Sequence, residues 1–152
     1  MRTENWGLLF VLFEMLHPLR GSCHCGFVSF EVDLPDERQM EVLECNCTIC
    51  TKKGCLHLII SRERLRLLSP ASEEELGLYQ FGSKTARHYF CPRCGICSFY
   101  VPKSHPDGYS VNLRALDCYD EIKNTVTIKP FDGRNNWDAS AAKTANMLHE
   151  SK

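Results

Sequence analysis

The sequence lacks a marked excess of charge of either sign. Its 18 lysines and arginines stand against 19 aspartates and glutamates, a formal net charge of −1. A protein that neutralises nucleic-acid phosphates normally carries a basic excess. The balance therefore argues against a nucleic-acid partner. We interpret the short basic runs, Lys52-Lys53 and Arg62-Glu63-Arg64, as solvated surface.

The sequence also lacks an apolar run long enough for a membrane span. The run from Gly7 to Phe13 is interrupted by Glu14 and falls far short of the roughly 20 residues that a span needs. A signal peptide is disfavoured, because Glu4 offsets Arg2 and no small-residue cleavage site follows. We therefore expect no membrane partner, and we interpret residues 1–19 as an amino-terminal extension whose apolar run packs on the core as a strand or helix.

Internal repeats and low-complexity stretches are missing as well. The chain has 152 residues, of which 43% are hydrophobic and 24% charged, as in ordinary soluble globular proteins. This length fits one domain. We place that domain at residues 20–137 and expect a carboxy-terminal helix or tail at residues 138–152.

Short extended segments separated by turns dominate the chain after Gly21. In the segment Phe27 to Val32, Ser29 and Glu31 alternate with apolar residues, which indicates a half-buried strand. Further strands are predicted at residues 55–60, 76–81, 87–90, 98–101, 109–113 and 125–129. Short helices are predicted at residues 72–76, around Cys50 and at residues 137–148, the last capped by Asn135 or Asn136. The predicted fold is mainly β, a single antiparallel domain with short helices.

What the sequence has in abundance is cysteine, with ten residues. Eight of them fall into three tight clusters, and only Cys55 and Cys118 stand apart. Tight clusters bring thiolates to one point, as zinc sites require, whereas disulfide frameworks spread their cysteines more evenly. We therefore predict zinc ligands and a reducing, cytoplasmic location.

One complete zinc site follows from pairing two of the clusters. A C-x-C or C-x-x-C pair supplies half of a tetrahedral shell, so two pairs close one site. The simplest combination is Cys23, Cys25, Cys91 and Cys94, which joins distant segments and would staple the domain. Cys97 is an alternative to Cys94, although Cys91 to Gly95 has the usual zinc-knuckle form.

The remaining cluster contains three cysteines, Cys45, Cys47 and Cys50. Three thiolates leave one coordination position open, the pattern of catalytic rather than structural zinc. The sequence therefore predicts a second zinc with these three ligands. Other residues could close the site and make it structural, namely Cys55, His57, Cys97 or Cys118; for Cys55 and Cys118 we favour a role as small buried apolar residues.

The histidines near these clusters have simpler interpretations. His24 lies between two predicted ligands, so its side chain should point away from the metal. His57 and His88 lie in predicted strands, where a core or wall position is expected, although either could transfer protons if it faced the open zinc.

The order of the cysteine motifs resembles the glutathione-dependent formaldehyde-activating enzyme family, also called S-(hydroxymethyl)glutathione synthases, which includes centromere protein V-like proteins. The resemblance rests on three segments in the same order and runs from about Arg20 to about Trp137: GSCHCGFVSFEV, ECNCTICTKKG and HYFCPRCGICSFYVPKSHPDGYSVNLRALD. Cys55 and Cys97 depart from the family pattern, and the extension before Leu19 has no counterpart in it.

The resemblance implies a β-tent fold and the same two zinc sites that the spacing predicts. It also implies a carbon-sulfur lyase that condenses formaldehyde with the thiol of glutathione. Glutathione carries two carboxylates, which Lys52, Lys53, Arg87 or Arg114 could bind if they are more than surface charges. Two alternatives remain: a non-catalytic, zinc-stapled interaction module of the centromere protein V-like type, and a lyase for another thiol or aldehyde.

Overall fold

A computed structural model describes residues 7, 11, 14, 17–34 and 40–148. In the apolar run of residues 7–13, the two described residues, Gly7 and Val11, are helical, and Val11 is exposed. The rest of that run, for which a packed strand or helix is predicted, lies outside the described residues. No helix in the described ranges has the length and apolar character needed to cross a membrane.

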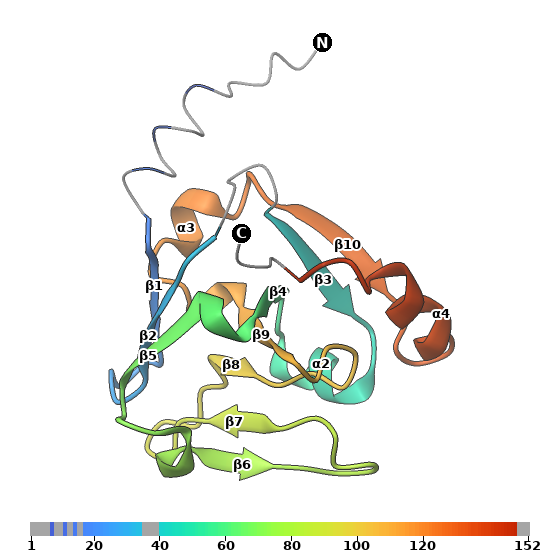
Figure 1. The fold of residues 1–152 in the computed structure, drawn as a ribbon, viewed down its shortest axis with the longest axis horizontal. Helices are drawn as coiled ribbons and strands as arrows, with labels where there is room; N and C mark the ends of the chain where they lie inside the picture. Colours follow the sequence, from blue (N-terminus) through green and yellow to red (C-terminus); the bar gives the residue numbers. More distant parts are fainter. Residues whose placement is uncertain (1–6, 8–10, 12–13, 15–16, 35–39, 149–152) are drawn as a thin grey trace.

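The described part of the molecule contains three β-sheets (Figure 1). The first contains β1 (Leu19–Ser22), β2 (Ser29–Val32) and β5 (Leu65–Ser69). The second has the order β10-β3-β4-β9-β8, with bounds Thr127–Phe131, Glu41–Cys45, His57–Ser61, Gly108–Asn112 and Phe99–Tyr100. The third is a hairpin of β6 (Gly77–Tyr79) and β7 (His88–Phe90).

All seven predicted strands are present, so the mainly β prediction is confirmed. Sequence reasoning missed β1, β3 and β5, which are short and carry charged or cysteine residues. One pairing differs from the antiparallel prediction, because β10 runs parallel to β3. β10 is an edge strand whose first four residues are exposed, and such an edge tolerates Pro130.

The helices are short. They are α2 (Thr48–Lys53), α3 (Tyr119–Ile122) and α4 (Trp137–Lys143), with 3₁₀ turns η2 (Arg62–Arg64), η3 (Glu73–Glu75) and η4 (Leu113–Ala115). α4 ends five residues before the predicted end of its helix. Asn136 occupies its N-cap position, but its side chain does not cap the helix and instead donates to Asp132 Oδ2 at 3.0 Å.

Strand β4 is buried on both faces and separates two apolar regions. Leu58 and Ile60 face the main core, where Phe30 and Phe99 meet edge to face with centroids 5.5 Å apart. On the opposite face, Ile59 joins a smaller cluster with Leu43 and Phe131. Because side chains alternate along a strand, His57 lies on the same face as Ile59, outside the main core.

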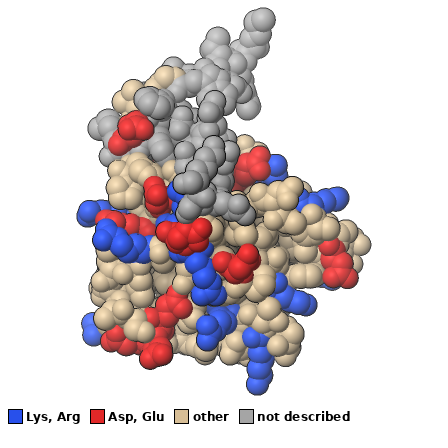
Figure 2. Space-filling view, in the orientation of Figure 1, with Lys and Arg blue, Asp and Glu red and all other residues tan. Residues whose placement is uncertain are grey.

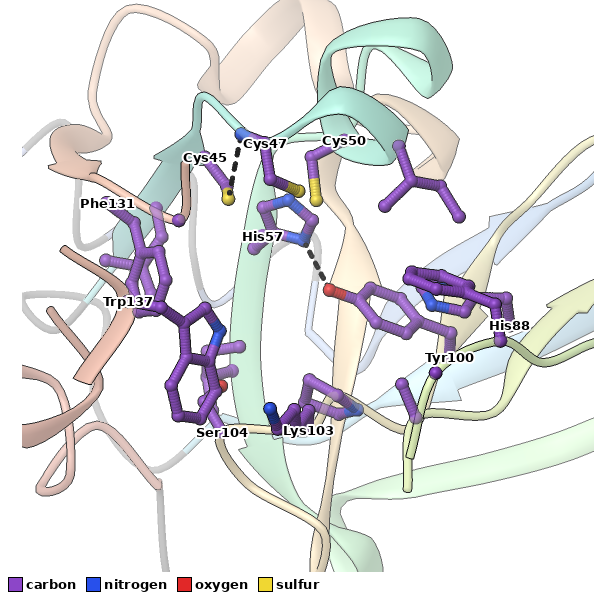
Figure 3. Close-up of a pocket in the computed structure, with 18 of the residues that line it drawn as sticks. Cys45, Cys47, Cys50, His57, His88, Tyr100, Lys103, Ser104, Phe131 and Trp137 are labelled. Carbon is purple, nitrogen blue, oxygen red and sulfur yellow. Dashed lines mark hydrogen bonds between the residues drawn. The ribbon is translucent and has the colours of Figure 1, made fainter. Parts of the chain in front are cut away.

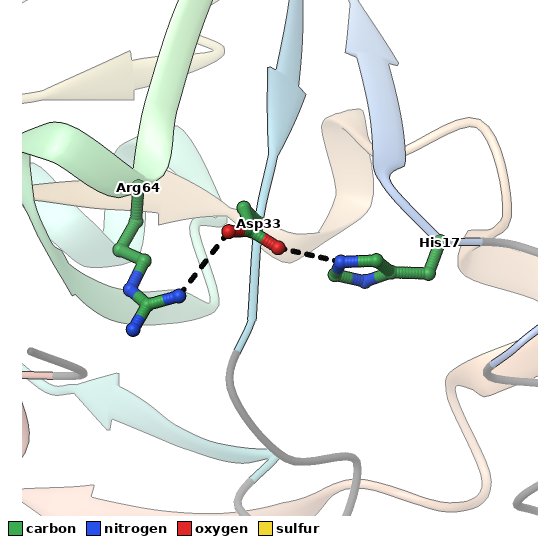
Figure 4. A network of polar contacts seen from close by, with 3 residues as sticks. All are labelled: His17, Asp33 and Arg64. Carbon is green, nitrogen blue, oxygen red and sulfur yellow. Dashed lines mark hydrogen bonds and ion pairs between the residues drawn. The ribbon is translucent and has the colours of Figure 1, made fainter. Parts of the chain in front are cut away.

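Charged side chains of both signs are interspersed on the face shown in Figure 2. One group of polar contacts, formed by His17, Asp33 and Arg64, lies at the end of the first sheet (Figure 4). Asp33, just after β2, accepts from His17 with Oδ1 and from Arg64 Nη1 with Oδ2, the latter at 3.2 Å. These contacts join the segments that enter β1 and β5 to the end of β2.

Candidate metal centres and pocket

The first four-cysteine group forms where two loops meet. Cys23 and Cys25 lie between β1 and β2, while Cys91 and Cys94 lie between β7 and β8. The four Sγ atoms all lie within 4.8 Å of one another, and Cys25 Sγ is 3.6 Å from the Sγ atoms of both Cys23 and Cys91. Thiolates about 2.3 Å from a tetrahedral zinc lie about 3.8 Å apart. The donor set and its spacing therefore fit one zinc ion.

Backbone amides point at these sulfurs. Val28 N–H donates to Cys23 Sγ at 3.2 Å, and Arg93 and Cys94 N–H each donate to Cys91 Sγ at 3.4 Å. A glycine with positive φ, Gly95, lets its loop turn tightly around the sulfurs. Such N–H donors stabilise negative sulfur, and the Ile96 amide is the main cause that lowers the pKa of Cys94 to about 6.

The second group lies at the end of β3 and the start of α2. The Sγ atoms of Cys45, Cys47 and Cys50 lie within 4.8 Å of one another. Hydrogen bonding from the Cys50 thiol is the main cause that lowers the pKa of Cys45 to about 6, and the Cys47 N–H, 3.5 Å from Cys45 Sγ, adds to it. In the described ranges, no histidine, aspartate, glutamate or other cysteine places a ligand atom within this group.

The loop after β10 closes over this second group. A Cβ on Gly133 would lie 2.7 Å from Cys45 Sγ, closer than side-chain atoms tolerate. Asn46 fixes the loop, because its Nδ2 donates to Asp132 Oδ1 at 2.8 Å and its Oδ1 accepts from Arg134 N–H at 3.0 Å. The absence of a side chain at Gly133 therefore leaves room for the sulfur cluster.

The three cysteines form one wall of a cavity of about 280 Å³ (Figure 3). Phe131 and Trp137 form a second wall, with Tyr100 and His88 opposite and Lys103 and Ser104 at the end away from the sulfurs. Most of the lining is apolar, and among the described residues that line the cavity Lys103 is the one lysine or arginine and none is an aspartate or glutamate. The Nζ atom of Lys103 lies 4.4 Å from the centroid of the Trp137 ring. The cavity can accommodate a small molecule with an apolar part and a negative group.

A hydroxyl pair holds His57 in this cavity. His57 Nδ1 lies 2.9 Å from Ser110 Oγ and 3.4 Å from Tyr100 Oη, and His57 Nε2 is buried with no hydrogen-bond partner in the described part of the chain. Burial, followed by the charge of Lys53, lowers the pKa of His57 to about 4. Burial also raises the pKa of Tyr100 well above its usual value, so both side chains are neutral near pH 7.

The side chain of Lys53 points toward a different set of groups. Its Nζ lies 3.2 Å from His88 Nδ1 and donates to Cys97 Sγ at 3.5 Å. Cys55 donates to Cys97 and is the main cause that lowers the pKa of Cys97 to about 7, with Lys53 adding to it. Cys55 and Cys97 therefore lie together, outside both metal groups.

The structure thus brings together the cysteines that the sequence grouped. None of the residues suggested to close the second group joins it: Cys55 and Cys97 pair with each other, His57 is a wall of the cavity, and Cys118 is buried before α3. None of the four cations suggested for carboxylates lines the cavity. Lys103, Tyr100 and Trp137 were missed, since nothing in their local sequence marks them as cavity residues.

Comparison with known proteins finds a matching family and a similar solved structure. Residues 18–130 match the sequence model of a family described as glutathione-dependent formaldehyde-activating enzyme. The chain is also similar to a protein of Rhodobacter sphaeroides of known crystal structure, with 34% sequence identity and a TM-score of 0.61. The likeness covers 72% of this chain and 97% of the other.

Proposed function

Because the chain belongs to the glutathione-dependent formaldehyde-activating enzyme family, we propose that it is a zinc-dependent carbon-sulfur lyase. Its reaction would be the condensation of formaldehyde with glutathione to S-(hydroxymethyl)glutathione. The observation that carries the proposal is the convergence of three thiols, Cys45, Cys47 and Cys50, on the wall of a cavity. The proposed fold is the β-tent type of this family, with residues 20–137 as its working unit.

The two cysteine groups support different roles. Cys23, Cys25, Cys91 and Cys94 offer four donors, a complete shell for a structural zinc. Cys45, Cys47 and Cys50 would hold the catalytic zinc, which supplies a Lewis acid that favours the thiolate form of glutathione. Because the three sulfurs face the cavity, a thiol bound there lies beside them.

In the reaction, a sulfur-carbon bond forms as the carbonyl π bond breaks. The π electron pair moves to oxygen, the thiol loses its proton, and the new alkoxide gains one. The product therefore contains all the atoms of glutathione and formaldehyde. The apolar walls exclude water and strengthen polar contacts inside the cavity. We assign Lys103 to a carboxylate of glutathione, because it is the lysine that lines the cavity.

An assay of thiol and aldehyde consumption tests this proposal. We expect zinc-loaded wild-type protein to exceed the spontaneous rate and Cys47→Ser to fall to it, while Cys118→Ser, altered outside both groups, stays active. Equal, near-background rates in wild type and Cys47→Ser would reject catalysis in favour of a zinc-stapled interaction module. A panel of thiols and aldehydes in the same assay would reveal a lyase with another substrate.

A further inference from the structure

We propose that His57 is a catalytic residue that donates a hydrogen bond from Nε2–H to the aldehyde oxygen. The inference rests on the proposed function and gives the cavity the electrophilic group that the cysteines do not supply. His57 Nε2 is the donor atom, because it is a buried ring nitrogen of a cavity-lining residue and has no hydrogen-bond partner among the described residues. A buried polar atom without a partner costs free energy, which a ligand can recover.

The neighbours of His57 determine which ring nitrogen holds the proton. The hydroxyl groups of Ser110 and Tyr100 both face Nδ1. Ser110 also hydrogen-bonds to Tyr100, so one of the two hydroxyl protons lies between them and one remains to donate to Nδ1, which favours the unprotonated, accepting form of that nitrogen. The proton of the neutral ring then lies on Nε2, which makes that atom a donor.

The location of His57 matches what the reaction needs. In Figure 3 its ring lies beside the sulfurs of Cys47 and Cys50, with Tyr100 on its other side. A thiol attacking from the cysteine wall would therefore develop alkoxide charge close to the ring. A fixed donor in a site shielded from water stabilises such charge more than water does, and no reorganisation is required.

The donor role leaves the proton of the ring in place. Burial and the nearby charge of Lys53 oppose a second proton on His57, and the neutral ring is too weak an acid to give up its own proton. As the sulfur-carbon bond forms, the oxygen receives the carbonyl electron pair and gains one proton, which balances the proton that the thiol loses. Ser110 and Tyr100 act through His57 and are positioning residues.

Two substitutions separate this role from simple packing. His57→Phe removes the donor and keeps a ring, and we expect kcat for glutathione and formaldehyde to fall by about 100-fold or more. The KM for glutathione should change little, because the thiol is held elsewhere. His57→Gln keeps an N–H near the position of Nε2 and should recover part of the loss. The control is His105→Phe, since His105 is equally buried but both its nitrogens have partners.

A measurement independent of turnover tests the tautomer. Long-range ¹H–¹⁵N correlation NMR on the zinc-loaded protein should show Nε2 of His57 protonated and Nδ1 bare, and Ser110→Ala should weaken that preference. A protonated Nδ1, or His57→Phe retaining wild-type kcat, would overturn the inference while the lyase proposal stands. Inactive wild-type protein would overturn both, so the two failures are distinguishable.

Discussion

At the scale of single residues, small and neutral groups shape the cavity as much as the cysteines do. Gly133 leaves the space that Cys45 Sγ occupies, and His57 and His88 are held neutral by burial and by Lys53. Neither property can be read from the residue type alone, because each depends on which atoms lie nearby.

Replacing Gly133 by alanine should damage the second metal group selectively. The new Cβ would lie 2.7 Å from Cys45 Sγ and 3.2 Å from Cys47 Cβ, so the sulfurs must move. We expect zinc affinity at this group to fall by about 10- to 100-fold, as for other changes next to ligands, with the first group unchanged. Competitive titration with a chromogenic chelator measures both affinities.

The matched control for that change is Arg134→Ala, which keeps the backbone N–H that donates to Asn46 Oδ1. Equal zinc affinities in Gly133→Ala and Arg134→Ala would contradict the steric role assigned to Gly133.

The lowered pKa of His57 predicts how stability depends on pH. Its folded pKa is about 4 and its unfolded pKa about 6.5, so between these values the unfolded state binds more protons. The contribution of His57 to the free energy of unfolding is therefore complete above pH 6.5 and is lost as the pH falls toward 4. At pH 5 the loss from this residue is about 2 kcal/mol.

Urea unfolding of wild type and His57→Gln at pH 7 and pH 5 measures this loss. Acid also releases zinc, but that effect is common to both proteins, so the difference between their unfolding free energies isolates His57. A difference that is the same at the two pH values would show that burial does not depress the pKa of His57.

At the scale of elements, the cavity is built where β4, α2 and the segment from β10 to α4 meet. The cysteine spacing predicted the two sulfur groups, since ligands close in sequence must converge. The walls were not predictable: Tyr100 and Lys103 come from one segment and Trp137 from another, both distant in sequence from the cysteines, and only the fold brings them together. β3 was missed because its five residues include two glutamates and a cysteine, which hide the strand pattern.

The start of α4 offers a probe of the cavity, because Trp137 lines it and its ring centroid lies 6.4 Å from that of Phe131. The chain has two tryptophans, so Trp6→Phe leaves Trp137 as the sole emitter. We expect glutathione to change the fluorescence of this variant saturably. Lys103→Met should raise the apparent Kd by about tenfold, the size of one charge-assisted hydrogen bond.

A fluorescence change that keeps rising without saturation would indicate nonspecific quenching and would remove the thiol from this cavity. Lys84→Met provides the matched control for the lost charge, because Lys84 is exposed and does not line the cavity.

At the scale of the whole molecule, the first metal group joins parts of the chain far apart in sequence. Cys25 and Cys91 are 66 residues apart, and their group fixes the loop between β1 and β2 to the loop between β7 and β8. The second group spans six residues, from Cys45 to Cys50, and links only β3 to α2. The first zinc would therefore be structural for the whole domain, and the second only for the cavity.

Cys25→Ser should consequently destabilise the protein much more than Cys47→Ser. A structural zinc can contribute on the order of 10 kcal/mol, comparable with the net stability of a small domain. We expect cooperative thermal unfolding, followed by circular dichroism, to be lost in Cys25→Ser and retained in Cys47→Ser. Equal melting temperatures would contradict the division of roles.

Counting metals by native mass spectrometry, with and without glutathione, tests whether the second cysteine group holds a zinc ion that binds the thiol. We predict two zinc ions in wild type, one in Cys47→Ser, and glutathione bound to wild type alone. One zinc ion in both proteins, with glutathione bound to neither, would contradict this prediction and leave a β domain with a single zinc and no thiol site.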